Sequence, residues 1–536
     1  MANDDQLIVV DMGLSFADDR LPGVDLVLPD ISYLEERREN IEGIFITHSH
    51  LDHIGGLTYL WDRLECPVYA SPLTATVIRR NMKETGLDKQ VDLRIFNFED
   101  PVKAGPFRVQ AVAATHSTPE SAMFDIRAGE TRVLVTGDWK NSESVVMHHN
   151  TDSDYLQQMG RDGDVAAIIS ESTNAIKSGH TPSEHCFYDA FRVLLERYDE
   201  SAIFIACQGL AGMSRLHVLY DLVPDFNRKI AVLGRSMREG VKAALQHNII
   251  EDSSYLVEPN KLESYPKNER LYVVTGSQAE PRAALTRLSN HDHHQAEIRA
   301  GDVAVFSARV IPGNELPIAN MKNRLRRMGV EIVTNNEIPN TYISGHAHAE
   351  EIASLISWVK PQSLLPVHGD YDHQVAQADI VRNNGWDDIG VTIPENGQVI
   401  VIDPQKGAYI TDDTVEISYL ALDGDRLLSA NDAEAMRERR KLSHNGVVAV
   451  SVITDSAGYV MQRPHVTVTG LAEDHEEQEV LAFEIQRNIE NYMANLDDKK
   501  RQNDGYVEEQ IRLAVMRHVR DHYGKKPVTA IHLLRI

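Results

Sequence analysis

The sequence is poor in cysteine and contains no long apolar run. Its 536 residues include three cysteines, Cys66, Cys186 and Cys207, which are widely separated and odd in number. This pattern argues against a disulfide framework and indicates a reducing compartment. No stretch of about 18 apolar residues occurs, so a membrane-spanning helix is not expected. The start, Met1 to Gln6, lacks the basic and apolar parts of a secretory signal. We therefore predict a cytoplasmic protein that does not associate with membranes.

Positive charge is also scarce. The chain has 54 Lys and Arg against 80 Asp and Glu, a formal net charge of -26. Proteins that coat nucleic acid are usually basic, because neutralising phosphates supplies most of their affinity. The charge therefore argues against a passive nucleic-acid-coating protein. It does not exclude an enzyme, which needs only one locally positive channel and whose bound divalent ions add charge.

The apolar pattern changes along the chain and predicts roughly three or four domains. Up to Asp138, short runs rich in Val, Ile and Phe alternate with polar turns and predict strands. Between about residues 182 and 336, strand candidates alternate with helical patterns, which is typical of a parallel sheet with crossover helices. From about Glu434 a basic helix is followed by two strands, two helices and a last strand. The strands are expected at 7–10, 43–47, 108–114, 132–136, 202–207, 229–233, 271–275, 302–307, 331–334, 362–367, 397–402, 447–453, 466–470 and 528–534.

The densest group of potential metal ligands lies in residues 47–56, Thr-His-Ser-His-Leu-Asp-His-Ile-Gly-Gly. It follows a predicted strand and precedes a helical pattern. Neutral imidazole and carboxylate are standard ligands of zinc. His48 and His50 can reach one ion together, and Asp52 and His53 then point toward a second. A polar surface loop is the alternative interpretation, but so dense a pattern after a strand favours a metal site.

Three further potential ligands follow predicted strands. Just beyond the strands at 108–114, 132–136 and 362–367 lie His116, Asp138 and His368. Sheets of α/β proteins tend to build their sites at the carboxyl ends of strands. The joint presence of these residues with the histidine-rich motif predicts a site for two metal ions.

This series of motifs resembles that of the metallo-β-lactamase superfamily, which folds as an αββα sandwich. The resemblance implies two Zn²⁺ ions per chain, with Mn²⁺ or Mg²⁺ as alternatives. It assigns the first ion to His48, His50 and His116, the second to Asp52, His53 and His368, and a bridging role to Asp138. Asp11 resembles the superfamily's first-strand aspartate, which organises the site without binding metal.

Three more motifs narrow the resemblance to the nucleic-acid-processing β-CASP group. Glu171, His346 and His368 resemble its three characteristic motifs in order. The α/β segment at about residues 180–340 occupies the place of its inserted domain. Within this group a histidine at the third motif is associated with RNA, whereas DNA-processing members tend to have valine. His368 therefore favours an RNA substrate.

Further segments resemble the ribonuclease J family of this group, over nearly the whole chain. They lie at 16–19, 22–25, 234–237, 275–278, 311–315 and 439–443. The sequence departs from the family at Ala279, where glycine is usual, and at Gly212 and Met213, where Ser-Asn is usual. It also begins only a few residues before Asp11, where relatives usually have a further glycine-rich strand segment.

The resemblance implies an α/β fold with three domains. These are a metallo-β-lactamase domain in two parts, an inserted β-CASP domain and, after a linker, a small C-terminal α+β domain. The expected bounds are 1–180 and 341–402, 181–340, 403–435 for the linker, and 436–536. The C-terminal domain resembles the family's assembly module, so a homodimer or homotetramer is expected.

The implied activity is hydrolysis of RNA phosphodiesters in RNA maturation and decay, by a 5′-to-3′ exonuclease that also cuts internally. The catalytic candidates are Asp52, Glu171 and His346. Asp52 would hold an ion and orient the attacking group, and Glu171 would orient a metal-binding histidine. His346 would protonate the leaving 3′-oxygen or grip the scissile phosphate.

A 5′-phosphate site is expected where a loop enters the helical pattern at 350–360. Free N–H groups at a helix start form an anion site without a basic side chain. By resemblance, the loop would bind the 5′-monophosphate of single-stranded RNA, with help from the inserted domain. The loop residues are Ser344, Gly345, His346 and Ala347, and the helpers are Arg215 and Ser236.

Three alternatives are weaker. Lactonases and glyoxalases with this fold lack the large α/β insertion. A DNA nuclease of the same group is disfavoured by His368. A catalytically inert RNA-binding subunit would have lost metal ligands, whereas all seven are present. The other histidine-containing segments, 148–149, 180, 291–294 and 473–477, are interpreted as solvated surface.

Overall fold

A computed structural model describes residues 1–17, 20–143, 150–208, 212–250, 253–311, 313–430 and 434–536. His148, His149 and parts of the family-like segments 16–19 and 311–315 lie outside the described residues. The chain forms two compact units. The first unit comprises Met1–Leu14 and Asp30–Ile417, and the second comprises Ser15–Pro29 and Ser418–Ile536.

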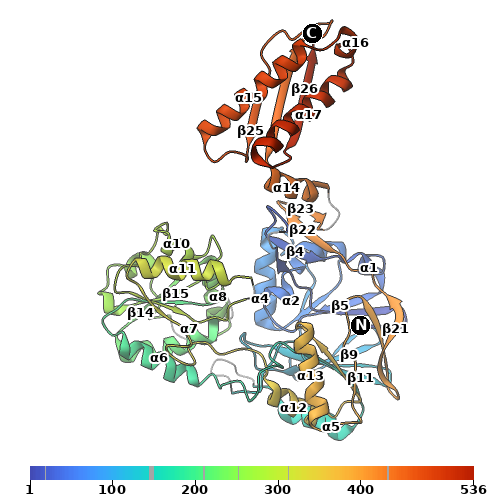
Figure 1. Ribbon diagram of the computed structural model, residues 1–536. Helices are drawn as coiled ribbons and strands as arrows, with labels where there is room; N and C mark the ends of the chain where they lie inside the picture. The colour runs from blue at the N-terminus through green and yellow to red at the C-terminus, as the bar shows by residue number, and fades with distance from the viewer. Residues whose placement is uncertain (18–19, 144–149, 209–211, 251–252, 312, 431–433) are drawn as a thin grey trace. The chain divides into compact units, whose positions relative to one another are not determined.

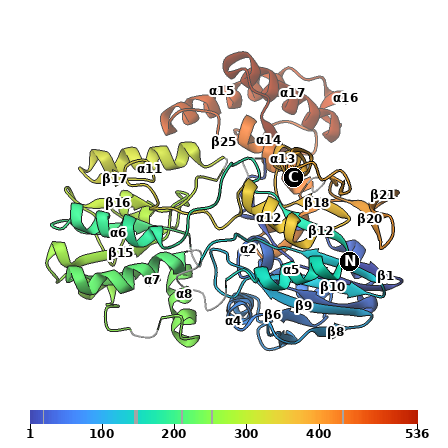
Figure 2. The ribbon, with the colours of Figure 1, turned by 90° about the horizontal axis from the view of Figure 1, so that it is seen from below.

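Two sheets pack face to face in the first unit and form the expected αββα sandwich (Figures 1 and 2). One has the strand order β1-β2-β5-β6-β7 and the other β19-β18-β12-β11-β10-β9-β8. Their bounds are β1 Ala2–Asn3, β2 Gln6–Val10, β5 Ile41–Phe45, β6 Val68–Ala70, β7 Leu93–Ile95, β8 Val102–Ala104, β9 Phe107–Ala113, β10 Ala122–Ala128, β11 Thr131–Val135, β12 Val165–Glu171, β18 Ser363–Val367 and β19 Gly390–Val391.

Alternating side chains of the seven-stranded sheet pack into two hydrophobic cores, one on each face of the sheet. In β9, Phe107 and Val109 pack between the sheets with Phe45, whereas Val112 points to the opposite face. This two-residue period is what a sheet buried on both sides requires. Helices cover its outer face, namely α5 Ser153–Asp162, α12 Ala349–Val359 and α13 Tyr371–Asn383, and α4 Pro72–Asn81 packs on the other sheet.

The inserted segment confirms the predicted parallel sheet. Its order is β14-β15-β13-β16-β17, and every neighbouring pair is parallel. Ile203 and Ile205 face one core, and Phe204 faces the other, so helices lie on both sides. The strands are β13 Ile203–Ala206, β14 Lys229–Leu233, β15 Arg270–Val274, β16 Val303–Phe306 and β17 Glu331–Val333. The helices are α6 Cys186–Arg197, α7 Met213–Leu222 and α8 Arg235–Gln246 on one face, and α10 Ala284–Ser289 and α11 Glu315–Arg327 on the other.

The second unit contains two small sheets, of order β23-β22-β4-β3 and β25-β24-β26, and α15 and α17 cover the latter. The bounds are β3 Ser15–Phe16, β4 Leu26–Pro29, β22 Tyr419–Asp423, β23 Arg426–Ser429, β24 Val447–Thr454, β25 His465–Thr469, β26 Val528–Arg535, α14 Glu434–Asn445, α15 His475–Ala494, α16 Asp498–Arg501 and α17 Asp504–Tyr523.

The segment 403–435, expected as a linker, carries regular structure instead. It contains β21 (Gly407–Thr414), which pairs with β20 (Gln398–Asp403), and then β22 and β23. In β22, Tyr419 pairs with Pro29 of β4, near the other end of the chain. A local apolar pattern carries no information about so distant a partner, which is why these strands were not predicted.

Within the described residues, no helix has the combination of length and apolar character needed to cross a lipid bilayer.

Candidate metal centre

The histidine-rich motif lies between the end of β5 and α2 (Leu51–Ile54). His48 and His50 lie in the connecting loop, and Asp52 and His53 lie in the short helix. Glycine is required at the helix end, because a Cβ on Gly55 would lie 2.4 Å from the side chain of Leu14. The motif is therefore held against the loop that follows β2.

Three histidines converge with Asp138 on one point. His48, His50, His116 and Asp138 each offer a ligand atom, and these atoms all lie within 4.8 Å of one another. His50 Nδ1 lies 3.0 Å from His48 Nε2 and 3.2 Å from His116 Nε2. Asp138 Oδ2 lies 3.7 Å from Nε2 of both His48 and His116. These are the residues that the sequence analysis assigned to the first ion and its bridge.

Neighbouring acceptors fix which nitrogen of each ring faces this point. His116 Nδ1 lies 2.8 Å from the Gly345 carbonyl oxygen, which can only accept, so the proton is on Nδ1. The Thr47 hydroxyl donates to Asp11, so it accepts from His48 Nδ1 at 3.0 Å. In both rings Nε2 keeps its lone pair. Metal-binding histidines are usually oriented in this way by a partner on the other nitrogen.

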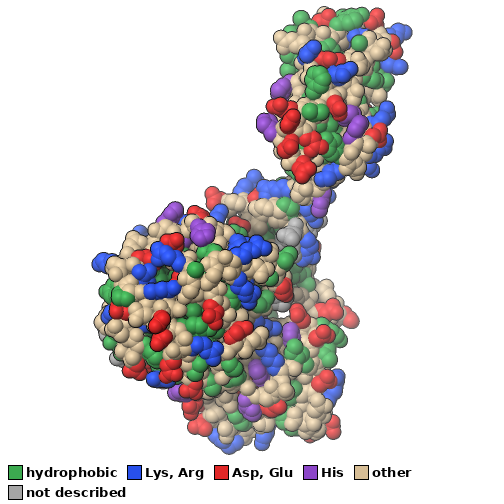
Figure 3. All heavy atoms as spheres, turned by 60° about the vertical axis from the view of Figure 1, so that its left-hand side comes forward, with side chains coloured by type: hydrophobic (Ala, Val, Ile, Leu, Met, Phe, Trp, Pro, Cys, Tyr) green, Lys and Arg blue, Asp and Glu red, His purple; other side chains and the backbone are tan. Residues whose placement is uncertain are grey.

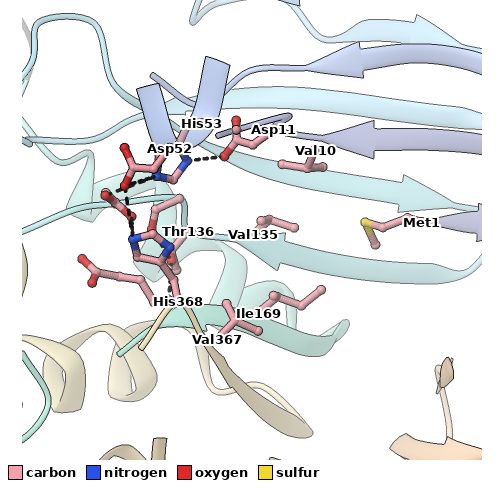
Figure 4. A pocket seen from close by; sticks show the side chains of 14 residues that line it. Met1, Val10, Asp11, Asp52, His53, Val135, Thr136, Ile169, Val367 and His368 are labelled. Carbon is pink, nitrogen blue, oxygen red and sulfur yellow. Dashed lines mark hydrogen bonds and ion pairs between the residues drawn. The ribbon is translucent and has the colours of Figure 1, made fainter. Parts of the chain in front are cut away.

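A second group contains Asp52, His53, Asp138 and His368, again with ligand atoms within 4.8 Å of one another (Figure 4). His53 Nδ1 lies 2.7 Å from Asp11, which leaves Nε2 facing Asp138 at 3.4 Å and Asp52 at 3.8 Å. His368 Nε2 lies 3.5 Å from Asp138 and 3.9 Å from Asp52. Asp138 therefore belongs to both groups, as the predicted bridge would.

The donor set fits divalent metal ions. His53 Nε2 and Asp138 Oδ1 are buried and have no hydrogen-bond partner in the described part of the chain. Leaving buried polar atoms unsatisfied costs free energy, and a cation between them would remove that cost. The residues that could hold the two ions are the seven predicted from the sequence. The centre thus has the composition and arrangement of a two-ion site.

Burial sets the protonation of the first group. It lowers the pKa of His48 and His116 well below the ordinary value and that of His50 to about 4, because a buried imidazolium loses its hydration. Burial would raise the pKa of Asp138, but the adjacent histidines, chiefly His368 and His53, hold it well below its usual range. The three imidazoles are thus neutral at neutral pH and Asp138 is charged, which are the forms that bind zinc.

His346 lies beside Asp138 and is held by Glu171. Its Nδ1 is 3.1 Å from both carboxylate oxygens of Glu171 and 3.9 Å from Asp138. Burial alone would lower the pKa of His346, but the charges of Glu171 and Asp138 outweigh it and raise the pKa to about 9. Glu171 also accepts from the backbone N–H of Trp139 at 3.1 Å. The carboxylate also accepts from the N–H of Thr173, and in the described part of the chain it has no hydrogen bond to any of the seven predicted ligands. The histidine that Glu171 orients is therefore His346, which lies with it and Asp138 in one group.

The loop at 344–347 adjoins the centre, but its N–H groups from His346 onward are not the free donors expected. The N–H of His346 donates to Ser344 Oγ, that of Ala347 to the Trp139 carbonyl, and that of His348 to Glu351. The next two N–H groups donate to the carbonyls of Lys177 and Gly179. The loop therefore connects separate segments of the chain by hydrogen bonds. Its N–H groups from His346 onward are used in these bonds and are not available to a phosphate.

The two predicted helpers from the inserted domain lie in different surroundings. Arg215 is buried in α7, where its guanidinium contacts Ser307 Oγ at 3.3 Å and the carbonyl of Ile343, just before the loop, at 3.5 Å. Ser236 is exposed in the first turn of α8. No hydrogen bond between described residues connects Ser236 with the metal centre, so its contact with phosphate stays a prediction.

Several residues that hold the loops together were not predicted from the sequence. Glu351, fully buried in the first turn of α12, accepts from the N–H groups of Asn141 and Thr181 at 2.7 Å and of His348 at 2.9 Å. Asn174 donates to Ser344 Oγ at 2.8 Å. A buried glutamate at a helix start gives no distinctive sequence signal, because acidic residues are common at that position.

A cavity of about 470 Å³ opens at the second group of ligands. Asp52, His53 and His368 lie at one end of it, and Val10, Val135, Ile169 and Met1 lie further along, between the two sheets (Figure 4). One end of the cavity is thus polar and metal-facing, and the other is apolar.

Four family models match the chain in succession. They are "Metallo-beta-lactamase superfamily" at residues 1–158, "Ribonuclease J, beta-CASP domain" at 201–325, "Zn-dependent metallo-hydrolase RNA specificity domain" at 337–389 and "Ribonuclease J C-terminal domain" at 434–536. These ranges agree in order with the expected domains, whose bounds stay predictions.

Curated relatives match over nearly the whole chain. Ribonuclease J of Sinorhizobium meliloti is 33% identical over 99% of this chain and 93% of its own length. Ribonuclease J of Helicobacter pylori (strain ATCC 700392 / 26695) is 31% identical, covering 98% of this chain and 76% of the relative. Ribonuclease J2 of Bacillus subtilis is 30% identical, covering 91% of this chain and 87% of the relative.

One solved structure supports the fold alone. A protein of unknown function from Enterococcus faecalis V583 superposes with a TM-score of 0.51 at 15% identity, over 76% of this chain and 95% of that one.

Proposed function

The chain belongs to the ribonuclease J family of metal-dependent RNA hydrolases, and we propose that it hydrolyses single-stranded RNA with two zinc ions. It acts from the 5′ end toward the 3′ end and also cuts internally, in RNA maturation and decay. The observation that carries the proposal is the convergence of seven ligands from separate loops into two groups that share Asp138.

The residues of the first group hold one ion and those of the second hold the other. When bound, two zinc ions lower the pKa of a water molecule to about 7 and stabilise the attacking and leaving oxygens of the phosphodiester. Zinc is supported over magnesium by the histidine-rich donor set, because Mg²⁺ prefers oxygen ligands.

The protein's own groups orient the ligands and move the proton. Asp11 fixes the ring of His53, and Thr47 and Gly345 fix His48 and His116. Glu171 holds Nδ1 of His346, so Nε2 is the nitrogen from which a proton passes to the leaving 3′-oxygen. In this scheme His346 is catalytic, Asp52 binds metal and faces the substrate, and Glu171 positions His346.

A preference for a 5′-monophosphate is part of the proposal. The loop at 344–347 lies against the first ion's ligands, since Gly345 accepts a hydrogen bond from His116. A terminal phosphate bound at this loop would lie at a fixed distance from the ions, so each cleavage would release one nucleotide. Because the N–H groups at 346–350 are engaged, the donors come from side chains or from residues before His346.

The proposal is tested by digesting 5′-labelled RNA and measuring zinc in the same protein sample. We expect about two zinc ions per chain at the centre and release of labelled mononucleotide, faster from 5′-monophosphate than from 5′-triphosphate RNA. His50→Ala combined with Asp52→Ala should abolish both hydrolysis and zinc binding at the centre. The matched control, His291→Ala in an exposed loop, should change neither.

Each outcome decides a part of the proposal. Unchanged hydrolysis in the double variant would overturn the site. Substoichiometric zinc without hydrolysis would identify an inert RNA-binding subunit. Equal rates for the two RNA ends would remove the 5′-phosphate site, and cleavage of single-stranded DNA in preference to RNA would favour a DNA nuclease. Assembly as a homodimer or homotetramer and a cytoplasmic location remain part of the proposal.

A further inference from the structure

Two histidines one helical turn apart face a glutamate in the C-terminal domain, outside the metal centre. His518 and His522 lie on α17, and Glu484 lies on the neighbouring α15. Each offers one ligand atom, and these atoms lie within 4.8 Å of one another. Figure 3 shows histidine side chains among acidic ones on the surface of this domain. Neither the metal centre nor the proposed RNA chemistry uses these residues.

The two helices run antiparallel, and the three side chains lie at the solvent-facing edge of the contact between them. Tyr523 reaches Glu477 and His518 reaches Glu484, so later residues of α17 meet earlier residues of α15. The buried faces repeat every fourth residue and pack on the sheet β25-β24-β26. Glu484 precedes buried Ile485, and His518 precedes buried Val519. The cluster is therefore fixed by the core beneath it while remaining open to solvent.

His522 has the orientation of a metal ligand. Its Nδ1 lies 2.8 Å from the carbonyl oxygen of His518, one turn earlier. A carbonyl only accepts, so the proton is on Nδ1 and Nε2 keeps its lone pair. A backbone carbonyl on Nδ1 is a common orienting partner of metal-binding histidines.

His518 is paired on both sides. Its Nε2 lies 3.2 Å from Glu484 Oε2 and its Nδ1 lies 3.1 Å from the amide of Asn488. When the amide of Asn488 donates to Nδ1, the ring proton is on Nε2 and links the ring to Glu484. If a metal ion binds Nε2, the ring proton moves to Nδ1. The Asn488 amide then turns so that its oxygen accepts a hydrogen bond from Nδ1. The number of protons on the ring is unchanged, because the proton leaves Nε2 and one is carried by Nδ1. The ion then lies between the His518 ring and the Glu484 carboxylate.

We propose that Glu484, His518 and His522 form a separate binding site for a transition-metal ion of the Zn²⁺ class, which clamps α17 to α15. Imidazole and carboxylate are the ligands that suit zinc, and three protein ligands leave a position for water. The C-terminal end of α17 adds a favourable potential for a cation. The site stabilises the C-terminal domain and takes no part in RNA hydrolysis.

The test counts zinc on the full chain after dialysis against a solution of buffered free Zn²⁺. Wild type should retain one zinc more per chain than His522→Ala or His518→Ala. His522 is exposed, and within the described residues its side chain hydrogen-bonds to the His518 carbonyl of its own helix and to no other group, so we expect its replacement to leave the fold intact. The matched control is His475→Ala, an exposed histidine on α15 whose ion pair is with Glu479 of the same helix. It should retain the wild-type count, and equal counts in all four proteins would overturn the proposal.

Hydrogen exchange locates the ion. Added Zn²⁺ should slow amide exchange in α15 and α17 of wild type and of the double variant His50→Ala, Asp52→Ala, which lacks the metal centre, but not in His522→Ala. RNA hydrolysis by His522→Ala should equal that of wild type. Failure of the proposed function would appear as absent RNA hydrolysis in wild type or as unchanged hydrolysis in the double variant. Amide exchange in α15 and α17 that does not change with zinc would overturn this inference alone.

Discussion

Single hydrogen bonds decide which ring nitrogen of each histidine faces the metal centre. Asp11 does so for His53 and, through the Thr47 hydroxyl, for His48. It lies outside both ligand groups, and its backbone has a positive φ of 61° that aims it inward from the end of β2. A residue held in this uncommon conformation indicates that its side chain is needed there.

Asp11→Asn should weaken metal binding without unfolding the chain. The amide has one oxygen for three donors, so its NH₂ would face Thr47 or His53 and force a ring nitrogen into the wrong protonation. Losses of such orienting partners typically cost about 10–100-fold in metal affinity or activity. Zinc affinity and kcat/KM measure the effect. Asp5→Asn, at an exposed position near the same strand, is the control and should match wild type. Wild-type zinc affinity in Asp11→Asn would contradict this role.

His346→Ala should lower kcat far more than RNA affinity, because the ring lies beside Asp138 and Glu171 holds it there. Loss of a positioned proton donor costs about 10²–10⁴-fold in rate. Single-turnover rates and binding of uncleaved RNA separate the two quantities. Glu171→Gln should show a smaller loss of the same kind. If rate and affinity fall equally in His346→Ala, the histidine binds substrate and does not transfer a proton.

At the scale of elements, the sequence predicted what neighbouring residues determine. Runs such as 203–206 and 303–306 are apolar throughout, and the structure confirms them as central parallel strands. The ligands converge because they follow β5, β9, β11 and β18, whose ends meet at one edge of the sandwich. The pairing of β4 with β22 could not be predicted, since the two strands lie far apart in the sequence. The hydrogen-bond acceptors of the N–H groups at 346–350 could not be predicted either, because several of them belong to loops that are distant in the sequence.

Helix α12 is anchored to these loops by Glu351, and its replacement should destabilise the first unit. In Glu351→Ala the N–H groups of Asn141, Thr181 and His348 lose their buried acceptor. Each such group costs about 1–3 kcal/mol, so we expect a loss of roughly 3 kcal/mol or more in the free energy of unfolding. Urea unfolding measures it. Glu350→Ala changes the exposed neighbour on the same helix and should cost little. Equal stabilities of the two variants would show that other groups hold the loops.

At the scale of the whole molecule, metal binding at the two-ion centre should be coupled to the stability of the first unit. All four tryptophans, Trp61, Trp139, Trp358 and Trp386, lie in that unit, so their fluorescence reports its unfolding. A ligand at 100 times its Kd stabilises by about 2.7 kcal/mol. Chelation should therefore lower the midpoint measured by fluorescence, and zinc should restore it.

The control for this coupling is the double variant His50→Ala, Asp52→Ala, in which chelation should leave the fluorescence midpoint unchanged. The same shift in both proteins would mean that the stabilising ion lies elsewhere in the chain.

The union of residues 15–29 with residues 418–536 has a consequence for biosynthesis. As the polypeptide leaves the ribosome, β4 appears among the first segments, yet its partner β22 is translated only after the entire sandwich and its insertion. Domains generally fold as they emerge, and an edge strand that waits unpaired is exposed to aggregation. One edge of β4 therefore lacks its partner until β22 has been translated, and the four-stranded sheet can close only after the sandwich and its insertion have been made.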